Sequence, residues 1–274
     1  MNSIKLGKTT IYSVSDGYIE FIREAFFPSI NETEWEAYPE YSNGIIQLNI
    51  GSFIIKTETD CILVDTGLGK LDHHINQPIR ETLISEILET GLSLDDISIV
   101  FMTHLHLDHV GTNMTKTETG WAPTFKNAKY MVSKEDWDLF SRLTDSKQFE
   151  YIKEQVTPLI DLGIISFFSG ETYISDEVIT FPTPGHTPGH TSLIIKSGNE
   201  TAVVLGDSAH IPPQVEETHW SPKADRNSSL SEQSRQKIMK YIEENGSIIA
   251  SGHFPSPGFG TIITQNNKNT YQTL

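Results

Sequence analysis

The stretch H-L-H-L-D-H over residues 104–109 constrains this chain more than any other feature of its sequence. It follows residues 96–102, a short run rich in apolar and β-branched side chains, which predicts a buried strand. Because His104 and His106 are two positions apart, they project to the same side of an extended backbone and can hold one metal ion. The carboxylate and imidazole that follow can face a second ion. Histidines that merely flank a strand rarely form such a pattern, so the stretch predicts a metal centre at the carboxyl end of a strand.

The same stretch matches the pattern H-x-H-x-D-H, and the chain thereby resembles the metallo-β-lactamase-fold hydrolases. Four further segments resemble motifs of that family, in the family's order: residues 64–67, 183–190, 205–208 and 252–258. The resemblance implies an α/β fold, a four-layer αββα sandwich of two ββα-like halves, with metals at the edge where the halves meet. The alternation of strand blocks with helices agrees with that architecture. We therefore expect a single domain over residues 1–274, with a helical insert at about residues 133–162.

The resemblance also implies a set of metal ligands. His104, His106 and His186 would bind a first ion, Asp108, His109 and His253 would bind a second, and Asp207 would bridge the two. The implied cofactors are two divalent metal ions per chain, with Zn2+ favoured and iron or manganese as alternatives. Asp65 ends a predicted strand nearby. It is either a turn carboxylate or, as the resemblance favours, an acceptor that orients a ligand imidazole.

The pattern over residues 252–260 most resembles the branch of acyl-homoserine lactonases and methyl-parathion-hydrolase-like enzymes. This resemblance implies a hydrolase whose metal-bound hydroxide attacks a lactone, ester or phosphotriester of a small molecule, with Asp108 moving the proton. In the lactonases a tyrosine usually stands three places after the bridging aspartate, and here that place is His210. We expect His210 either to be catalytic, by donating a hydrogen bond to a substrate oxygen, or to cap the turn.

Two other functions compete with this interpretation. A glyoxalase-II-like thioesterase is disfavoured by the ending F-P-x-P-G over residues 254–258. A non-catalytic metal-binding module would be expected to lose ligands, and the implied set is complete. In the β-lactamases proper one ligand is typically a cysteine, sought at the position of Asp207, so the sequence also argues against antibiotic degradation.

Aromatic side chains are dense between residues 21 and 41, beside two prolines. Pockets for small molecules are lined by apolar and aromatic groups, so this segment either walls a substrate pocket or caps the core. We take Phe26 and Phe27 as candidate substrate-binding residues on the first interpretation.

Local patterns predict several boundaries. Ser-Asp-Gly at residues 15–17 is expected to turn the first strand, and residues 266–274 to form a polar tail. Ser133 opens a capping-box pattern, so the helical insert is expected to begin with a helix there. Residues 229–245 predict a long helix stopped by Gly246.

The composition of the chain limits the kinds of molecule that it is expected to bind and the compartment in which it is expected to act. The chain has 20 Lys and Arg against 36 Asp and Glu, a net charge of −16, which disfavours nucleic acid and anionic membranes. No apolar run reaches the roughly 20 residues that span a membrane, and the N-terminus lacks a signal-peptide pattern. The single cysteine, Cys61, is expected to be a buried small hydrophobe in a strand. We therefore expect a cytoplasmic enzyme with a small-molecule substrate, and association into a homodimer is left open.

Overall fold

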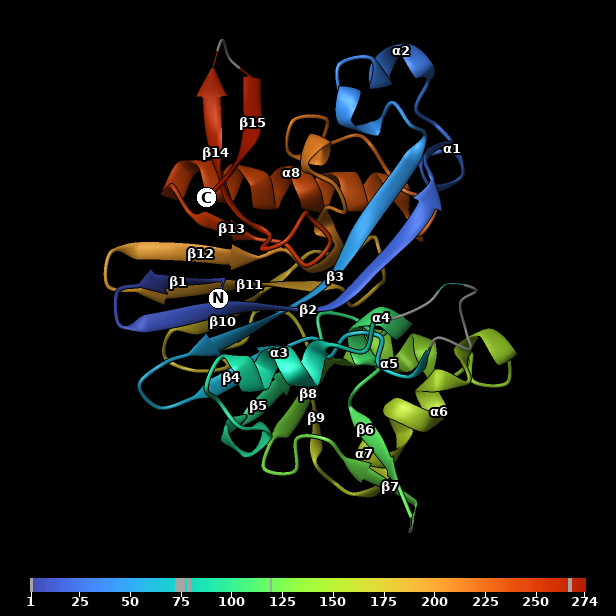
Figure 1. The fold of residues 1–274 in the computed structure, drawn as a ribbon, viewed down its shortest axis with the longest axis vertical. Coiled ribbons are helices and arrows are strands. Elements are labelled where there is room, and N and C mark those ends of the chain that lie inside the picture. The colour runs from blue at the N-terminus through green and yellow to red at the C-terminus, as the bar shows by residue number, and fades with distance from the viewer. Residues whose placement is uncertain (1, 72–76, 78–79, 119, 266–267) are drawn as a thin grey trace.

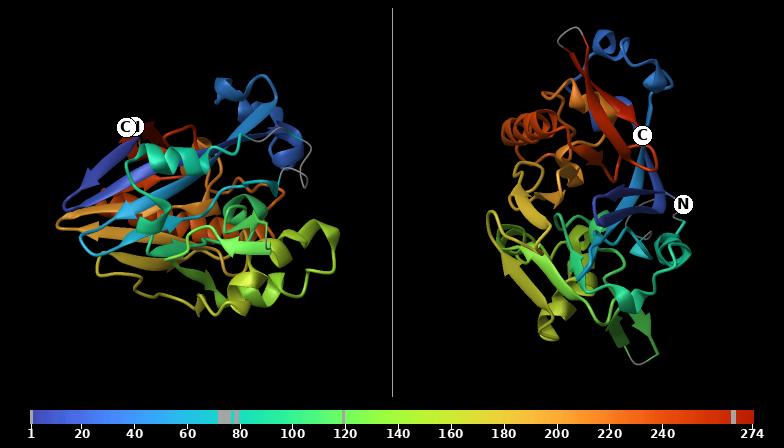
Figure 2. Two further views of the ribbon diagram at one scale, coloured as in Figure 1. Left: turned by 60° about the horizontal axis from the view of Figure 1, so that its bottom comes forward. Right: turned by 90° about the vertical axis from the view of Figure 1, so that its left-hand side faces the viewer.

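The protein is described by a computed structural model that covers every residue except 1, 72–76, 78–79, 119 and 266–267. Two β-sheets pack face to face, and helices cover their outer faces (Figure 1, Figure 2). This arrangement confirms the predicted α/β sandwich with four αββα layers. Within the described residues, no helix is both long and apolar enough to cross a membrane.

The first sheet has the strand order β1-β2-β3-β4-β5-β8-β9. Its strands are β1 Ser3–Leu6, β2 Thr9–Ile22, β3 Ile45–Lys56, β4 Cys61–Val64, β5 Ile99–Phe101, β8 Lys129–Ser133 and β9 Ile165–Phe168. A separate hairpin, β6 Met114–Thr117 and β7 Gly120–Pro123, lies beside it. The second sheet has the order β10 to β15, with bounds Val178–Pro182, Thr191–Ser197, Glu200–Val204, Ile248–Ala250, Phe259–Gln265 and Lys268–Thr273.

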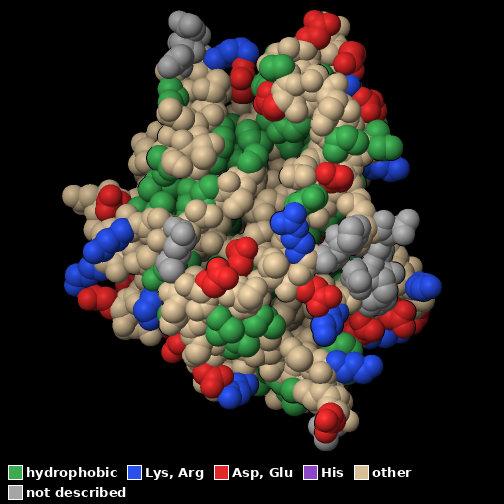
Figure 3. Space-filling view, in the orientation of Figure 1, with side chains coloured by type: hydrophobic (Ala, Val, Ile, Leu, Met, Phe, Trp, Pro, Cys, Tyr) green, Lys and Arg blue, Asp and Glu red, His purple; other side chains and the backbone are tan. Residues whose placement is uncertain are grey.

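The helices complete the outer layers. On the first sheet lie α3 Leu83–Glu89, α5 Lys134–Phe140, α6 Tyr151–Gln155 and α7 Thr157–Asp161, and on the second lies α8 Ser228–Asn245. Two short helices, α1 Arg23–Phe26 and α2 Glu32–Trp35, form an arm between β2 and β3, and α4 Leu107–Val110 follows β5. Lys and Arg side chains are scattered among Asp and Glu on the face in Figure 3, without a continuous basic patch.

The core is built from the two-residue alternation of the strands. In β4, Ile62 and Val64 face the second sheet, whereas Leu63 faces the helices on the first sheet. Burial of each such side chain stabilises the fold by ~1.5–3 kcal/mol, so both faces of the central strands contribute. Cys61 is buried and unpaired, as predicted.

Several predicted boundaries are confirmed. The Ser133 side chain accepts hydrogen bonds from the backbone N–H groups of Glu135 and Asp136 at the start of α5. Helix α8 ends at Gly246, whose φ of 57° is left-handed, and glycine adopts this conformation without the clash that a Cβ would cause.

Two predicted boundaries are wrong. Residues 15–17 do not end the first strand, because β2 continues through a register shift between Ser15 and Tyr18. Such a bulge adds residues to one strand without breaking the pairing. The predicted polar tail instead contains β15, which pairs with β14 at a sheet edge. Edge strands expose one side to solvent, which explains why a polar sequence forms a strand there.

Candidate metal centre

The centre lies where strands of both sheets end at one edge of the sandwich. Strands β4 and β5 are parallel neighbours in one sheet, and β12 and β13 are parallel neighbours in the other. His104, Asp207 and His253 each stand three residues after the last residue of a strand, β5, β12 and β13 respectively. Because the carboxyl ends of parallel strands meet at one edge, three loops distant in sequence bring these side chains together.

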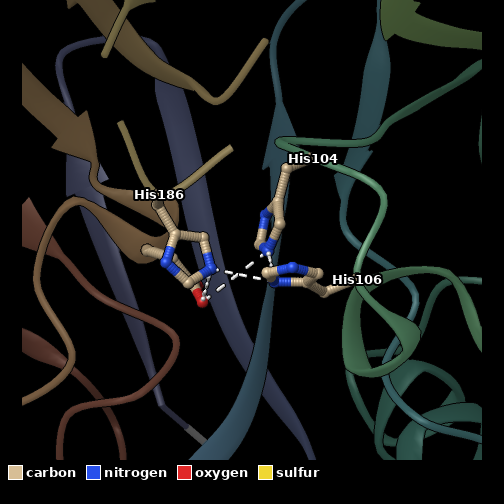
Figure 4. Close-up of side chains that lie close together, drawn as sticks. His104, His106 and His186 are labelled. Atoms are coloured by element: carbon tan, nitrogen blue, oxygen red, sulfur yellow. Dashed lines mark hydrogen bonds and ion pairs between the residues drawn. The ribbon is translucent and has the colours of Figure 1, made fainter. Parts of the chain in front are cut away.

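The first group of side chains consists of three imidazoles and one carboxylate oxygen. Nδ1 of His106 lies 2.9 Å from Nε2 of His104 and 2.9 Å from Nε2 of His186, and the three rings point toward one another (Figure 4). Oδ2 of Asp207 lies 3.1 Å from Nε2 of His186 and 3.7 Å from Nε2 of His104. Donors bound tetrahedrally to zinc at ~2.0–2.1 Å are themselves about 3.3 Å apart, so this spacing fits one ion.

The second group uses the other oxygen of the same carboxylate. Oδ1 of Asp207 lies 3.2 Å from Nε2 of His109, and Nε2 of His253 lies 3.2 Å from both oxygens of Asp207. Oδ2 of Asp108 lies 3.7 Å from each of the same two nitrogens. Oδ1 of Asp207 therefore faces the second group and Oδ2 faces the first, with His253 in reach of both oxygens.

The electrostatics of these groups suit a cation. Nε2 of His109 and Oδ1 of Asp207 are buried and form no hydrogen bond to any described residue. Burial by itself raises the pKa of Asp207, but the surrounding imidazoles outweigh it and hold that pKa well below its ordinary value. Buried polar atoms without partners are costly, and a divalent ion between these atoms would satisfy them. The donor set therefore fits divalent metal ions.

The protonation of the imidazoles differs within the first group. Burial, together with neighbouring imidazoles, lowers the pKa of His104 and His106 well below the ordinary value. Burial also acts to lower the pKa of His186, but the carboxylates of Asp207 and Asp225 raise it to about 9. Because a metal ion needs neutral imidazole, binding of an ion would displace the proton on His186.

Four ligand-type imidazoles have a hydrogen-bond partner at Nδ1, on the side of the ring away from the other ligands; for His104 it is Oγ1 of Thr103, 3.0 Å away. His109 Nδ1 lies 2.9 Å from Oδ2 of Asp65, and Asp65 also accepts hydrogen bonds from Thr103. Asp65 has a φ of 63°, a left-handed conformation that is strained for a residue with a Cβ. His253 Nδ1 lies 2.8 Å from the Asn49 backbone oxygen, and His186 Nδ1 lies 2.9 Å from Oδ1 of Asp225. Such partners fix the ring orientation and the tautomer.

Two further side chains hold the loops in place. Asp136 in α5 is fully buried and accepts hydrogen bonds from Leu105 N at 3.1 Å, Gly189 N at 2.7 Å and Thr187 Oγ1 at 3.0 Å. Burial raises the pKa of Asp136 to about 6. His190 Nε2 accepts a hydrogen bond of 2.8 Å from the backbone N–H of Asp207. Asp136 therefore ties the His104–His109 loop to the loop of His186.

Sequence reasoning missed three of these supports. Asp225 lies in a segment without periodicity, and Asn49 contributes a backbone oxygen that no sequence pattern reveals. Asp136 is in a capping pattern at the start of a helix, where an acidic residue is unremarkable. Only the spatial meeting of loops makes these residues recognisable.

His210 lies inside the cluster. Its Nε2 is 3.2 Å from Oδ2 of Asp207, and its ring stacks on that of His253 with centroids 5.4 Å apart. Burial lowers the pKa of His210 to about 4, although Asp207 acts in the opposite direction. The imidazole is therefore neutral at pH 7. His210, Asp207 and His253 also form a group close enough to hold a metal ion.

The two candidate pocket phenylalanines occupy different positions. Phe26 contacts the His210 ring edge-on, with centroids 5.6 Å apart, and keeps 8% of its surface exposed. Phe27 is 0% exposed and packs against Phe26 on one side and Trp35 and Trp220 on the other. Phe26 therefore borders the cluster, and Phe27 stands behind it in the aromatic core of the arm.

Comparisons with known proteins agree with this geometry. A family model described as the metallo-beta-lactamase superfamily matches residues 47–253, more than half of the chain. An N-acyl homoserine lactonase of Bacillus cereus is 24% identical over 226 residues, which cover 76% of this chain and 82% of that protein. A probable metallo-hydrolase of Methanocaldococcus jannaschii is 28% identical over 192 residues, 70% of either protein.

Solved structures share the whole architecture. AidC, a dizinc quorum-quenching lactonase solved with a bound product, superposes with a TM-score of 0.83 at 24% identity, covering 100% of this chain and 97% of that one. The hydrolase AbOPH superposes with a TM-score of 0.86 at 22% identity and the same coverage. Together with the family match, which includes all seven ligand-type positions, these likenesses identify the fold. The chain therefore belongs to the metallo-beta-lactamase superfamily, as one of its metal-dependent hydrolases.

Proposed function

We propose that this protein is a dinuclear metal-dependent hydrolase that opens lactones or cleaves related ester or phosphotriester bonds of small molecules. The observation that carries the proposal is the placement of Asp207, whose two oxygens face two separate groups of imidazoles. One ion in each group, zinc by preference, would account for the ligand-type side chains of the cluster other than His210. The lactonases among the similar proteins support lactones as the first substrates to test.

The chain's own residues supply the rest of the chemistry. Two bound divalent ions would lower the pKa of a water molecule and polarise the substrate oxygen. Asp108 is the least buried carboxylate of the cluster, with 16% of its side chain exposed, so it can meet both water and substrate. We assign to Asp108 the transfer of a proton from the attacking water to the leaving oxygen. The carbonyl carbon gains the water oxygen, its bond to the ring oxygen breaks, and a hydroxy acid results.

His210 is assigned to the substrate oxygen. Because its imidazole is neutral at pH 7, it carries one N–H and can donate one hydrogen bond. A donor aimed at developing negative charge stabilises the transition state more than the ground state. His210 occupies the place at which lactonases of the family usually carry a tyrosine hydroxyl, also a donor.

Phe26 is assigned to the wall of the substrate pocket, with Phe27 supporting it from behind. Phe26→Ala is expected to raise KM for apolar acyl substrates by about tenfold, because roughly 1.4 kcal/mol of apolar contact is lost. Metal content, measured by elemental analysis, should not change. Phe27→Ala is expected to shift KM in the same direction through loss of support. Kinetics unchanged for both variants, over several acyl lengths, would count against the assignment.

A substrate panel tests the reaction class. Metal-reconstituted protein is expected to hydrolyse lactones faster than aryl esters and phosphotriesters, measured as kcat/KM for each. A dominant rate with thioesters would instead support the glyoxalase-II-like alternative. If the protein binds two ions but hydrolyses no substrate of the panel, the result would support a non-catalytic metal-binding module.

The remaining expectations concern the domain organisation, the cellular location and the oligomeric state. We propose one domain over residues 1–274, with the helical insert at about 133–162 as part of it, and action in the cytoplasm on a small molecule. The homodimer stays a prediction.

A further inference from the structure

Helix α8 buries a guanidinium beside the metal centre. Arg235 is 0% exposed, and its donors all have partners. Nε donates to Ser208 O at 2.6 Å, Nη1 to Thr218 O at 2.6 Å and Trp220 O at 2.8 Å, and Nη2 to Ser231 Oγ at 3.1 Å and Asp225 Oδ2 at 3.4 Å. A guanidinium has five N–H donors, so this one is fully satisfied.

Two partners of Arg235 are directly connected to the first group of ligands. Asp225, whose side chain is 0% exposed, faces Arg235 with one oxygen and lies 2.9 Å from Nδ1 of His186 with the other. Ser208 directly follows Asp207, so the bond to Ser208 O fixes the turn that carries the bridging carboxylate. One buried side chain thus holds both His186, through Asp225, and Asp207, through the backbone.

We propose that Asp225 and Arg235 are positioning residues that set the affinity of the His104–His106–His186 group for its ion. The inference rests on the proposed function, which places an ion there. A neutral His186 can offer a lone pair at Nε2 only when its proton is on Nδ1, and the carboxylate of Asp225 accepts that proton's hydrogen bond. Arg235 in turn keeps Asp225 in place.

Stability alone is a poor explanation of this pair. Removing two charges from water is costly, and apolar replacements of buried ion pairs are often neutral or stabilising. The connection to His186 and to the Asp207 turn gives the buried charges a role that an apolar pair could not supply.

The test compares stepwise zinc dissociation constants, measured by competition with a chromophoric chelator. Asp225→Asn keeps the size of the side chain but removes its charge, and is expected to weaken one binding step by about 10–100-fold. His106→Ala identifies that step, because His106 belongs only to the first group. Arg235→Lys should weaken the same step, because an ammonium cannot replace five donors. The double variant Arg235→Lys with Asp225→Asn should weaken that step by less than the sum of the two single effects, because Arg235 acts through Asp225.

Two matched controls accompany these variants. Asp65→Asn removes the corresponding partner of His109 and should weaken the other step. Glu244→Gln changes an exposed carboxylate near the C-terminal end of α8, paired with Lys240, and should leave both steps unchanged. In zinc-loaded wild type, 15N NMR of the His186 ring should show a proton on Nδ1. In metal-free Asp225→Asn, at a pH where the ring is neutral, the two tautomers should mix.

The inference would be overturned if Asp225→Asn left both steps unchanged. It would also be overturned if both steps weakened equally, in parallel with a loss of stability of the metal-free protein, because that result marks a merely structural role. If Asp225→Asn does not fold, Ser221→Ala is a less disruptive variant. The Ser221 hydroxyl donates a hydrogen bond of 2.5 Å to Oδ2 of Asp225, and its removal must weaken the same step. Wild type that binds no zinc would overturn the proposed function as well, whereas two bound ions with an unaffected variant overturn only this inference.

Discussion

Asp207→Asn is expected to remove both metal ions from the protein. The two carboxylate oxygens of Asp207 face different groups of imidazoles, and asparagine replaces one of them with an NH2 group, which has no lone pair for a cation, and removes the negative charge. Metal content should fall from about two equivalents to less than one. The rate should fall by on the order of a thousandfold or more, since the ions supply several kcal/mol of transition-state stabilisation.

His253→Ala provides the contrast. Nε2 of His253 approaches Oδ1 of Asp207 and belongs to the second group, so its loss should weaken mainly one ion. Elemental analysis and zinc titration of both variants distinguish the two patterns. Retention of two ions at wild-type affinity in Asp207→Asn would show that this carboxylate does not bridge the groups.

His210→Ala is expected to lower kcat/KM by roughly a hundredfold while both ions remain bound. A hydrogen-bond donor to a developing oxyanion is worth ~3 kcal/mol, and alanine offers no donor. His210→Tyr restores a donor of the kind that lactonases carry and should recover lactone hydrolysis in part. The measurements are steady-state kinetics and metal content on the same preparations.

Other outcomes for His210→Ala have distinct meanings. Nε2 of His210 lies 3.2 Å from Oδ2 of Asp207, close enough for a ligand. Loss of one metal equivalent would therefore identify His210 as a ligand and disprove the donor assignment. Near-normal turnover with a lowered Tm would identify it as a structural histidine that packs against His253 and Phe26.

The sandwich could be predicted because its strands and its ligand loops have strong local patterns. The H-x-H-x-D-H spacing and the glycine-rich turns mark where strands end, and the structure brings those turns to one edge. The edge strand β15 escaped prediction because its sequence, K-N-T-Y-Q-T, is polar and pairs with only one neighbour. Its strand character comes from the tertiary structure rather than from local propensity.

The supports of the centre were less predictable than its ligand-type residues. Asp225 and Asp136 act through contacts between loops far apart in sequence, and neither has a distinctive spacing. The aromatic density before residue 41 was compatible with a pocket wall or with a cap of the core, and it could not separate Phe26, which touches His210, from Phe27, which is buried behind it. Side-chain burial depends on the arm's packing against Trp220, which no local pattern contains.

The metal content of the protein tests the central claim most directly. Protein purified without chelators, or reconstituted with Zn2+ and then desalted, should contain about two divalent ions per chain by elemental analysis, one for each group of ligands around Asp207. Protein that stays metal-free after reconstitution with zinc, iron or manganese, while folded and with every ligand intact, would contradict the account.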